Sequence, residues 1–142
     1  MVEGFCTNTD VHGGGNRGRK QKVSYYYDED FSVFQVSDSH PIKPLRIKMT
    51  DTLIREYGMD KQMENLKVDE EYVSQVDFTL FHSDDYVDCL RQVTPEHKEK
   101  YQDHFHRFCF SESDGDCPVF DYMFDYCQRY TAGTLVASDQ LA

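Results

Sequence analysis

The sequence contains no tryptophan, and no apolar run approaches the roughly 20 residues needed to span a bilayer. Its first residues also lack the pattern of a secretory signal, in which a charged segment precedes an apolar one. The five cysteines are an odd number without the paired spacing of a metal site. We therefore expect a chain that is not inserted in a membrane and that keeps its thiols reduced inside the cell.

Positive charge is scarce, because 15 Lys and Arg residues stand against 26 Asp and Glu residues and give a formal net charge of −11. The shortage is uneven, since residues 1–22 carry four basic and two acidic groups while the rest of the chain is strongly acidic. Nucleic-acid binding depends mainly on basic side chains that neutralise phosphates, so direct binding of DNA or RNA is not expected. An acidic surface suits a basic partner, although many acidic proteins are simply soluble.

Residues 1–21 are rich in Gly, Asn, Thr and charged side chains, with Gly13-Gly14-Gly15 near the middle. This segment has no apolar periodicity, so we predict a flexible tail there and a folded domain over residues 22–142. The basic stretch Arg17–Lys22 fits either a nuclear-import signal or a solvated part of the tail. Apolar residues make up 39% of the chain, which is compatible with a packed core.

Only the start of the domain has the composition of a β-strand. The stretch KVSYYY at residues 22–27 is rich in β-branched and aromatic side chains, and residues 33–36 are placed to pair with it as a hairpin. A helix is predicted from Pro44 to Gly58, since proline favours a first turn and glycine a stop. One stripe of that helix, by 3.6-residue spacing, is formed by Arg46, Met49, Leu53 and Tyr57.

Helical signals dominate the remainder of the chain. Ser83 is a candidate N-cap, followed by two acids in the first turn, and this helix should end near Thr94-Pro95. Its inward face is predicted to consist of Tyr86, Val87, Leu90 and Val93. A short polar helix is predicted over residues 95–104, and a polar loop over residues 111–115. Helical spacing then returns at Phe120, Met123, Phe124 and Cys127. One or two strands and several helices predict either a small, mostly helical fold or part of a larger domain.

Four motifs stand in a fixed order along the chain: residues 22–30 (KVSYYYDED), 40–50 (HPIKPLRIKMT), 82–86 (HSDDY) and 116–121 (DCPVFD). In this order and spacing they resemble the opening of class I histone deacetylases, and the match runs from about residue 20 to the last residue. The resemblance implies an arginase-like α/β domain with a parallel sheet and flanking helices. This chain is expected to hold its amino-terminal, mostly helical part.

The resemblance also implies a chemistry, namely the zinc-dependent hydrolysis of acetyl-lysine in proteins such as histone tails. In the family, zinc polarises the acetyl carbonyl and activates water, a histidine pair manages protons and a tyrosine stabilises the oxyanion. The zinc ligands, an Asp-x-His pair and a second aspartate, follow the region that this chain matches. We therefore expect no catalytic residue, metal ligand or cofactor in the chain, and no activity of the chain alone.

Five residues receive roles from the resemblance. Asp116 matches a rim aspartate that grips the substrate backbone through charge-assisted hydrogen bonds, and from the residues alone it fits equally well the N-cap of the following helix. Ile42, Arg46 and Tyr126 match residues that line an inner channel. By spacing, Ile42 and Tyr126 are also ordinary core positions, and Arg46 also fits an arginine that reaches water or pairs with a buried acid. Lys43 matches a lysine that contacts an inositol phosphate in corepressor-bound members, and alone it is a surface lysine.

Two segments depart from the family pattern. The loop before His40 is glycine-rich in the family, whereas residues 34–39 of this chain contain no glycine and so lose the backbone freedom that glycine supplies. The loop over residues 109–115 is longer than in the family pattern. The alignment of Asp116 with the family's rim aspartate therefore depends on where the extra residues are placed.

Two other sets of residues resemble metal ligands. Asp10-Val11-His12 has the Asp-x-His form of the family's zinc motif, but it lies in the predicted tail, where no sheet end supports it. His104 and His106, with Cys109 nearby, are side chains of the type that binds zinc, or else a solvated histidine pair.

Two functions of different classes follow. The first is a class I histone deacetylase family member, located in the nucleus by resemblance or else in the cytoplasm, and inactive alone. The second is a non-catalytic interaction module that binds a corepressor-complex scaffold or a full-length deacetylase through its acidic, aromatic surface. A helical protein with a structural metal at His104 and His106 is a third reading.

Overall fold

The computed structural model of the chain describes residues 22–111 and 115–141. The tail predicted for residues 1–21, with Asp10-Val11-His12 and most of the basic stretch, lies outside the described residues. Within the described ranges the chain is mostly helical and holds one two-stranded parallel sheet, as the sequence predicts for this part of an α/β domain. No helix in these ranges combines the length and the apolar character needed to cross a membrane.

The sheet is built from two short strands that are far apart in the sequence. Strand β1 (Val23–Tyr26) pairs in parallel with strand β2 (Met63–Leu66), with Val23 opposite Met63. The strand expected over residues 22–27 is therefore confirmed. The hairpin expected with residues 33–36 is wrong, because those residues form no strand and β1 pairs with β2 instead.

A long crossover joins the two strands, as parallel pairing requires. It consists of the short 3-10 helices η1 (Glu29–Ser32) and η2 (Met59–Gln62) on either side of helix α1 (Leu45–Glu56). Helix α1 follows Pro44 and ends just before Gly58, whose φ of 68° only glycine adopts readily. The helix predicted between these two residues is thus confirmed, and the unit formed is β–α–β.

The side of α1 that faces the strands is not the stripe predicted from the sequence. Its most buried residue is Asp51, which is 6% exposed and accepts hydrogen bonds from Arg55 Nε at 2.7 Å and from the Tyr25 hydroxyl at 3.4 Å. Ile47 and Ile54 lie half-buried on the same side. The buried charge of Asp51 is compensated by Arg55 and Tyr25, so a polar residue can occupy the interface between α1 and the strands. The predicted stripe lies on the opposite, solvent-exposed side. Its exposed members are Arg46, Met49, Leu53 and Tyr57.

The middle of the chain is a series of short helices: α2 (Glu70–Ser74), η3 (Phe78–Leu80), α3 (Asp84–Gln92), η4 (Lys98–Tyr101) and α4 (Gln102–Phe108). Ser83 is the N-cap residue of α3, as predicted, and Val87, Leu90 and Val93 are buried while Tyr86 is half-buried. The helix expected over residues 95–104 begins later, because a turn follows Pro95 and the chain becomes helical only at η4 and α4.

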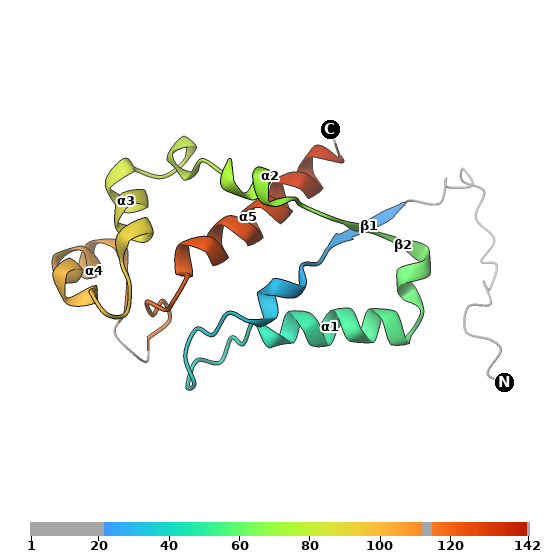
Figure 1. Ribbon diagram of the computed structural model, residues 1–142, viewed down its shortest axis with the longest axis horizontal. Coiled ribbons are helices and arrows are strands. Elements are labelled where there is room, and N and C mark those ends of the chain that lie inside the picture. Colours follow the sequence, from blue (N-terminus) through green and yellow to red (C-terminus); the bar gives the residue numbers. More distant parts are fainter. Residues whose placement is uncertain (1–21, 112–114, 142) are drawn as a thin grey trace, which may run out of the picture.

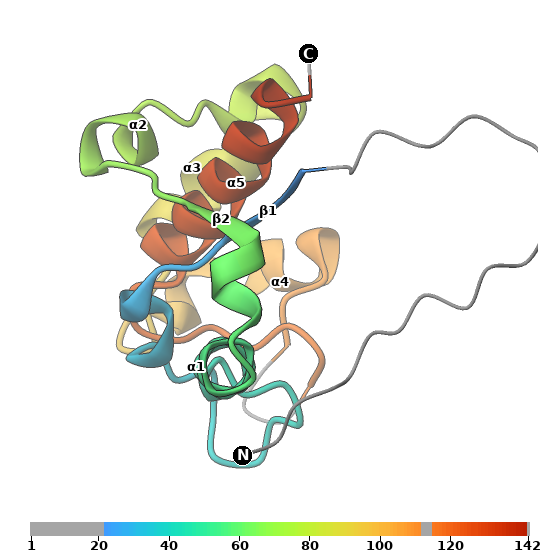
Figure 2. The same cartoon turned by 90° about the vertical axis from the view of Figure 1, so that its right-hand side faces the viewer.

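The longest helix, α5 (Met123–Asp139), crosses the molecule and contacts both strands as well as α2 and α3 (Figures 1 and 2). The sequence predicted that Phe120 belongs to the same helix as Met123. Phe120 instead lies before α5, because Tyr122 has a φ of 61° and is the N-cap residue of that helix. Phe120 still packs into the core. The cluster at this end of the molecule joins α3, α4 and α5 and consists of Leu90, Val93, Phe105, Phe120 and Met123.

Helix α5 approaches β1 closely where it has no side chain. A Cβ atom on Gly133 would lie 2.1 Å from Cδ1 of Tyr26, so only glycine leaves room for this ring. The ring is held on its other sides, because its hydroxyl donates to Asp28 Oδ2 at 3.3 Å and its edge meets the Phe31 ring at a centroid distance of 6.1 Å. The ring therefore cannot move aside without loss of other contacts.

An arginine one turn earlier on α5 joins three segments. The Arg129 guanidinium is 12% exposed and binds Glu70 with both terminal nitrogens, at 2.7 and 3.0 Å. It also contacts Asp125 at 3.1 Å and Asp28 at 3.3 Å. Burial alone would lower the pKa of Arg129, but the hydrogen bonds that it donates to Glu70 and Asp125 raise that pKa above its ordinary value. The start of α2, the end of β1 and α5 are thereby held together.

Replacement of Gly133 by alanine tests the close contact of α5 with Tyr26. Alanine favours a helix by about 1 kcal/mol over glycine, yet the overlap with the ring is expected to lower the free energy of unfolding by about 1–3 kcal/mol. The measurement is urea unfolding followed by circular dichroism. Thr134→Ala, at an exposed neighbour, is the control and should change stability by less than about 0.5 kcal/mol. A Gly133→Ala variant as stable as the parent would contradict the packing described.

Candidate functional site

A buried histidine joins the two loops that carry the predicted site residues. His40 is 9% exposed, and its Nδ1 lies 3.1 Å from the backbone N–H of Ile42, which can only donate. Nδ1 is then the acceptor, so the ring proton sits on Nε2, which donates to the backbone carbonyl of Asp116 at 3.3 Å. The imidazole therefore links the segment before α1 to the segment before α5.

The loop that carries Asp116 is itself closed by backbone contacts. The Ser111 N–H donates to the Cys117 carbonyl at 2.8 Å, and the Cys117 N–H donates back to the Ser111 hydroxyl, also at 2.8 Å. Asp116 is exposed in this loop, and α5 begins only after Tyr122. The N-cap reading of Asp116 is therefore wrong, because the following helix starts too far along the chain.

The segment that leads into α1 is ordered by a lysine. Lys43 Nζ donates to the backbone carbonyls of Ser37 and Asp38, each at 2.7 Å, and its side chain remains exposed. Lys43 also lines a shallow pocket of about 400 Å³ with Phe34 and neighbouring residues. Its ammonium group thus holds the loop over residues 37–38 in place and stays accessible at the surface.

The expected inner-channel residues are only partly brought together. Tyr126 is half-buried among aromatic rings, with edge-on contacts to Phe34 at 5.2 Å and to Phe31 at 5.7 Å. Burial raises the pKa of Tyr126, and the positive charge of Arg46 offsets part of that rise. Ile42 is 50% exposed, so its reading as an ordinary core residue is wrong. Arg46 is exposed and pairs with no buried acid in the described residues.

Next to Tyr126 on α5, burial also perturbs a thiol and a second phenol. Burial raises the pKa of Cys127, and a hydrogen bond with Tyr130 lowers it in part. Burial also raises the pKa of the Tyr130 hydroxyl, and the neighbouring thiol adds to that effect. These groups are uncharged near neutral pH, so this part of α5 offers hydrogen bonds rather than charges.

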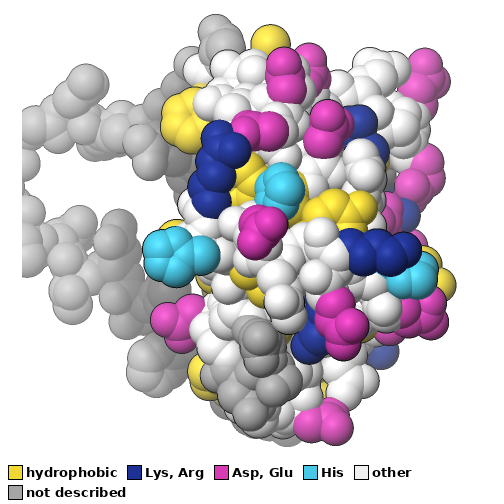
Figure 3. All heavy atoms as spheres, turned by 90° about the vertical axis from the view of Figure 1, so that its left-hand side faces the viewer, with side chains coloured by type: hydrophobic (Ala, Val, Ile, Leu, Met, Phe, Trp, Pro, Cys, Tyr) yellow, Lys and Arg dark blue, Asp and Glu magenta, His cyan; other side chains and the backbone are white. Residues whose placement is uncertain are grey.

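The possible metal ligands do not form a metal site. In residues 22–111 and 115–141, no group of three or more His, Cys, Asp or Glu side chains is placed to hold a metal ion. His104 lies between the rings of Tyr101 and Phe108, at centroid distances of 6.2 and 5.7 Å, and His106 is exposed. On the face formed by α3 and α4, acidic, basic and histidine side chains are interspersed (Figure 3). The described side chains therefore form no set of ligands that could bind the zinc ion that the resemblance implies.

Two residues important for the site were given no role from the sequence. His40 stands at the head of the second motif, and that position was the only signal for it, because its partner is a backbone carbonyl 76 residues away. Arg129 lies in a stretch with helical spacing, and two of its carboxylate partners, Asp28 and Glu70, come from segments that are far away in the sequence. Such long-range partners cannot be read from local patterns.

Comparison with known proteins identifies the family. A family model described as histone deacetylase domain matches residues 40–142. The chain is 38% identical over 126 residues to probable histone deacetylase 1-B of Xenopus laevis, an alignment that covers 89% of this chain and 25% of that protein. It is 37% identical over 125 residues to histone deacetylase 1 of Homo sapiens, with 88% of this chain and 25% of that protein covered.

A plant relative gives the same result. The chain is 37% identical over 122 residues to histone deacetylase 9 of Arabidopsis thaliana, which covers 86% of this chain and 28% of that protein. The chain thus spans about a quarter of the length of these relatives. The similarity extends over the loops joined by His40 and over α5, and the resemblance found in the sequence motifs is confirmed. The chain belongs to the histone deacetylase family.

Proposed function

We propose that this chain forms the amino-terminal part of a class I lysine deacetylase domain. In this proposal Asp116 holds the backbone of the acetylated substrate, and Ile42, Arg46 and Tyr126 line an inner channel. The substrates of the complete domain are acetyl-lysines in proteins such as histone tails, and the location is the nucleus. Family membership supports each of these assignments.

One observation carries the proposal, namely the hydrogen bond from His40 Nε2 to the Asp116 carbonyl. It brings the loop with the expected substrate aspartate next to the segment with Ile42 and Arg46, although the two are far apart in the sequence. A carboxylate can hold the backbone amides of a bound peptide through charge-assisted hydrogen bonds, which are stronger than neutral ones. The Asp116 carboxylate is exposed and therefore accessible to a peptide.

We further propose that these 142 residues do not deacetylate lysine by themselves. In the family, hydrolysis depends on a zinc ion and a pair of adjacent histidines. The six histidines of this sequence include no adjacent pair, and the described side chains offer no set of zinc ligands. The chain would then contribute binding surfaces, and the metal chemistry would be supplied by other residues.

A deacetylation assay tests this proposal. The purified chain, incubated with zinc and an acetylated histone-tail peptide, is expected to release no acetate above the buffer rate, as measured by mass spectrometry of the peptide. Human histone deacetylase 1 in the same buffer is the positive control. Release of acetate by the chain that stops on addition of a chelator would refute the proposal.

Replacement of His40 by alanine tests how the two loops are joined. Loss of one net hydrogen bond, worth about 1 kcal/mol, is expected to raise the hydrogen-exchange rate of the Ser111 and Cys117 amides about fivefold. The readout is exchange measured by NMR or mass spectrometry, with the amides of α3 as an internal reference. His82→Ala, at an exposed histidine, is the matched control. Equal exchange in the two variants would show that His40 does not hold the loop.

A second function, as a module that binds a corepressor scaffold or a full-length deacetylase, is favoured by the exposed side of α1. Met49 is 61% exposed and Leu53 is 55% exposed, on the helix that follows Lys43. Apolar side chains in a row on one helix are typical of a protein-binding surface. Lys43 would add a contact to an inositol phosphate at the edge of that surface.

Co-sedimentation tests this second function. The chain is mixed with purified human histone deacetylase 1, with and without inositol hexakisphosphate, and analysed by sedimentation velocity. A complex is expected, and Met49→Lys should weaken it about tenfold or more, since a charge then lies against an apolar surface. Thr52→Lys, on the same helix, is the control. Free migration of both proteins under all conditions would exclude binding to a full-length deacetylase.

A further inference from the structure

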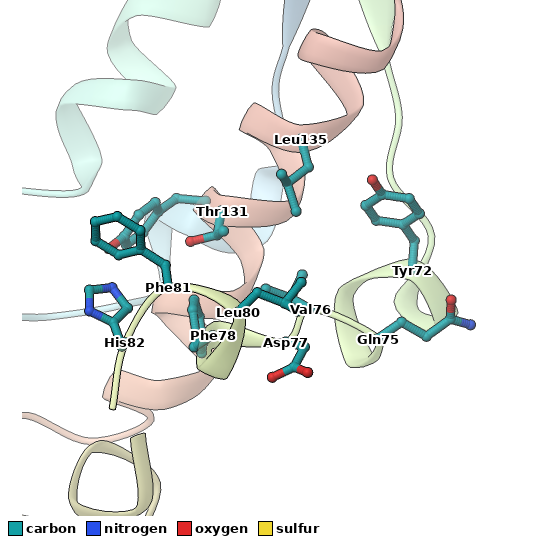
Figure 4. Close-up of a pocket in the computed structure, with 11 residues that line it drawn as sticks. Tyr72, Gln75, Val76, Asp77, Phe78, Leu80, Phe81, His82, Thr131 and Leu135 are labelled. Atoms are coloured by element: carbon teal, nitrogen blue, oxygen red, sulfur yellow. The ribbon is translucent and has the colours of Figure 1, made fainter. Parts of the chain in front are cut away.

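A groove lies between α2, the segment that follows it and the second half of α5, and its volume is about 640 Å³ (Figure 4). Thr131 and Leu135 enter it from α5, and Tyr72 and Gln75 enter it from α2 and its end. Apolar side chains supply much of the lining, namely Val76, Phe78, Leu80, Phe81, Tyr130 and Leu135. The expected site residues Ile42, Lys43, Arg46, Asp116 and Tyr126 are absent from this lining, so the groove is separate from the deacetylase-type site.

Two neighbouring side chains of the groove are almost fully exposed. Leu80 is 87% exposed and Phe81 is 89% exposed, and Tyr130 and Leu135 opposite them are 49% and 42% exposed. Single exposed apolar residues are common, but a contiguous group that surrounds a concavity marks an interaction surface.

The groove has a preformed base. The Phe78 ring packs edge-on against Phe124 of α5, with a centroid distance of 5.6 Å. Asp77 caps η3, because its carboxylate accepts from the Thr79 N–H at 2.9 Å and from the Thr79 hydroxyl at 2.6 Å. The Phe81 ring meets the His82 ring edge-on at 5.0 Å. A ligand would therefore enter a site whose walls are already ordered, which reduces the entropy cost of binding.

Acidic groups mark the rim of the groove. Asp77 lines it, and the hydrogen bonds from Thr79 lower the pKa of its carboxyl, so it is ionised at neutral pH. The hydroxyl of Tyr72, another lining residue, donates to Asp139 at 3.2 Å, and the amide of Gln75 donates to Glu71 at 3.4 Å. Among the described residues that line the groove there is no lysine or arginine.

Arg91, a cation that acts on Asp77 of this rim, is already engaged by other groups. Arg91 contributes to the low pKa of Asp77, but its guanidinium forms an ion pair with Asp88 at 3.7 Å and lies over the Phe124 ring at 5.1 Å. Glu71 and Asp139 have no ion pair with a described lysine or arginine. The rim therefore keeps negative charge next to an apolar surface.

We propose that this groove is the docking site of a basic protein segment, which covers Leu80 and Phe81 with aliphatic side chains and sets lysine or arginine against Asp77, Glu71 and Asp139. Charge decides between this partner and a second copy of the chain. The formal net charge of −11 makes two copies repel, whereas a basic segment is attracted to an acidic rim. The inference stands on the groove alone and does not depend on the proposed deacetylase role.

Fluorescence anisotropy with three labelled peptides tests the docking site on the 142-residue chain. The probe is a peptide of alternating leucine and lysine, and the two comparison peptides replace every lysine by glutamine or every leucine by serine. The leucine–lysine peptide is expected to bind at least about tenfold more tightly than either comparison peptide, because apolar contact and charge both contribute. Added salt should weaken its binding by screening the rim.

Variants locate the bound peptide. Phe81→Ser and Leu80→Ser are each expected to weaken binding about tenfold, as is typical for the loss of a central contact. Asp77→Asn should weaken it less and should reduce its dependence on salt. Val33→Ser, at an exposed valine directly after η1 and outside the groove, is the matched control and should leave binding unchanged. Circular dichroism of each variant checks the fold, and Leu80→Ser decides the outcome if Phe81→Ser is misfolded.

Three outcomes would overturn the proposal. The first is equal binding of the leucine–lysine and leucine–glutamine peptides, which would remove the role of charge. The second is unchanged binding in both the Leu80→Ser and the Phe81→Ser variants, which would place the peptide elsewhere. The third is self-association of the chain in sedimentation velocity that Phe81→Ser abolishes, since the groove would then be an interface between two copies.

Discussion

The position of the longest helix depends on one cation held among carboxylates. Arg129 on α5 binds both oxygens of Glu70 and reaches Asp28 after β1, so the helix, the strand unit and α2 share a single centre of charge. Bidentate pairing fixes direction as well as distance. One turn further along, Gly133 lets the Tyr26 ring lie against the helix backbone. The ion pairs set where α5 lies along β1, and the glycine sets how close it comes.

The loops that carry the proposed site residues are positioned by this arrangement. Tyr126 lies three residues before Arg129 on α5. Its ring packs against the rings of Phe31 and Phe34 because the ion pairs of Arg129 fix the position of α5 along β1. The loop with Asp116 leads into the same helix, and His40 ties that loop to the entrance of α1. Residues from both ends of the described chain thus meet around one helix. Their roles toward substrate and channel remain proposals that rest on family membership.

Local signals predicted the elements, and long-range partners decided the rest. Pro44, Gly58 and Ser83 gave correct helix limits, because caps and stops act within one turn. Strand β2 was missed, since Glu64 and Asn65 have weak strand preference and the strand exists through its pairing with β1. The buried side of α1 was not identified, because Asp51 looks like a surface residue until its partners Tyr25 and Arg55 are known. For the site, the motifs assign roles to Asp116 and Lys43 that stay predictions, and no local pattern could reveal the contact between the His40 imidazole and a carbonyl 76 residues away.

The distance in sequence between Asp28 and Arg129 has a consequence for synthesis. The two residues are 101 positions apart, and Arg129 lies in the last helix of the described chain. A ribosome releases the strand unit and α2 well before it releases α5, so for that interval several carboxylates face one another without their arginine. Contacts of such long sequence separation form slowly. The nascent polypeptide therefore spends this period with its aromatic rings uncovered, which is the condition under which chaperones bind emerging chains.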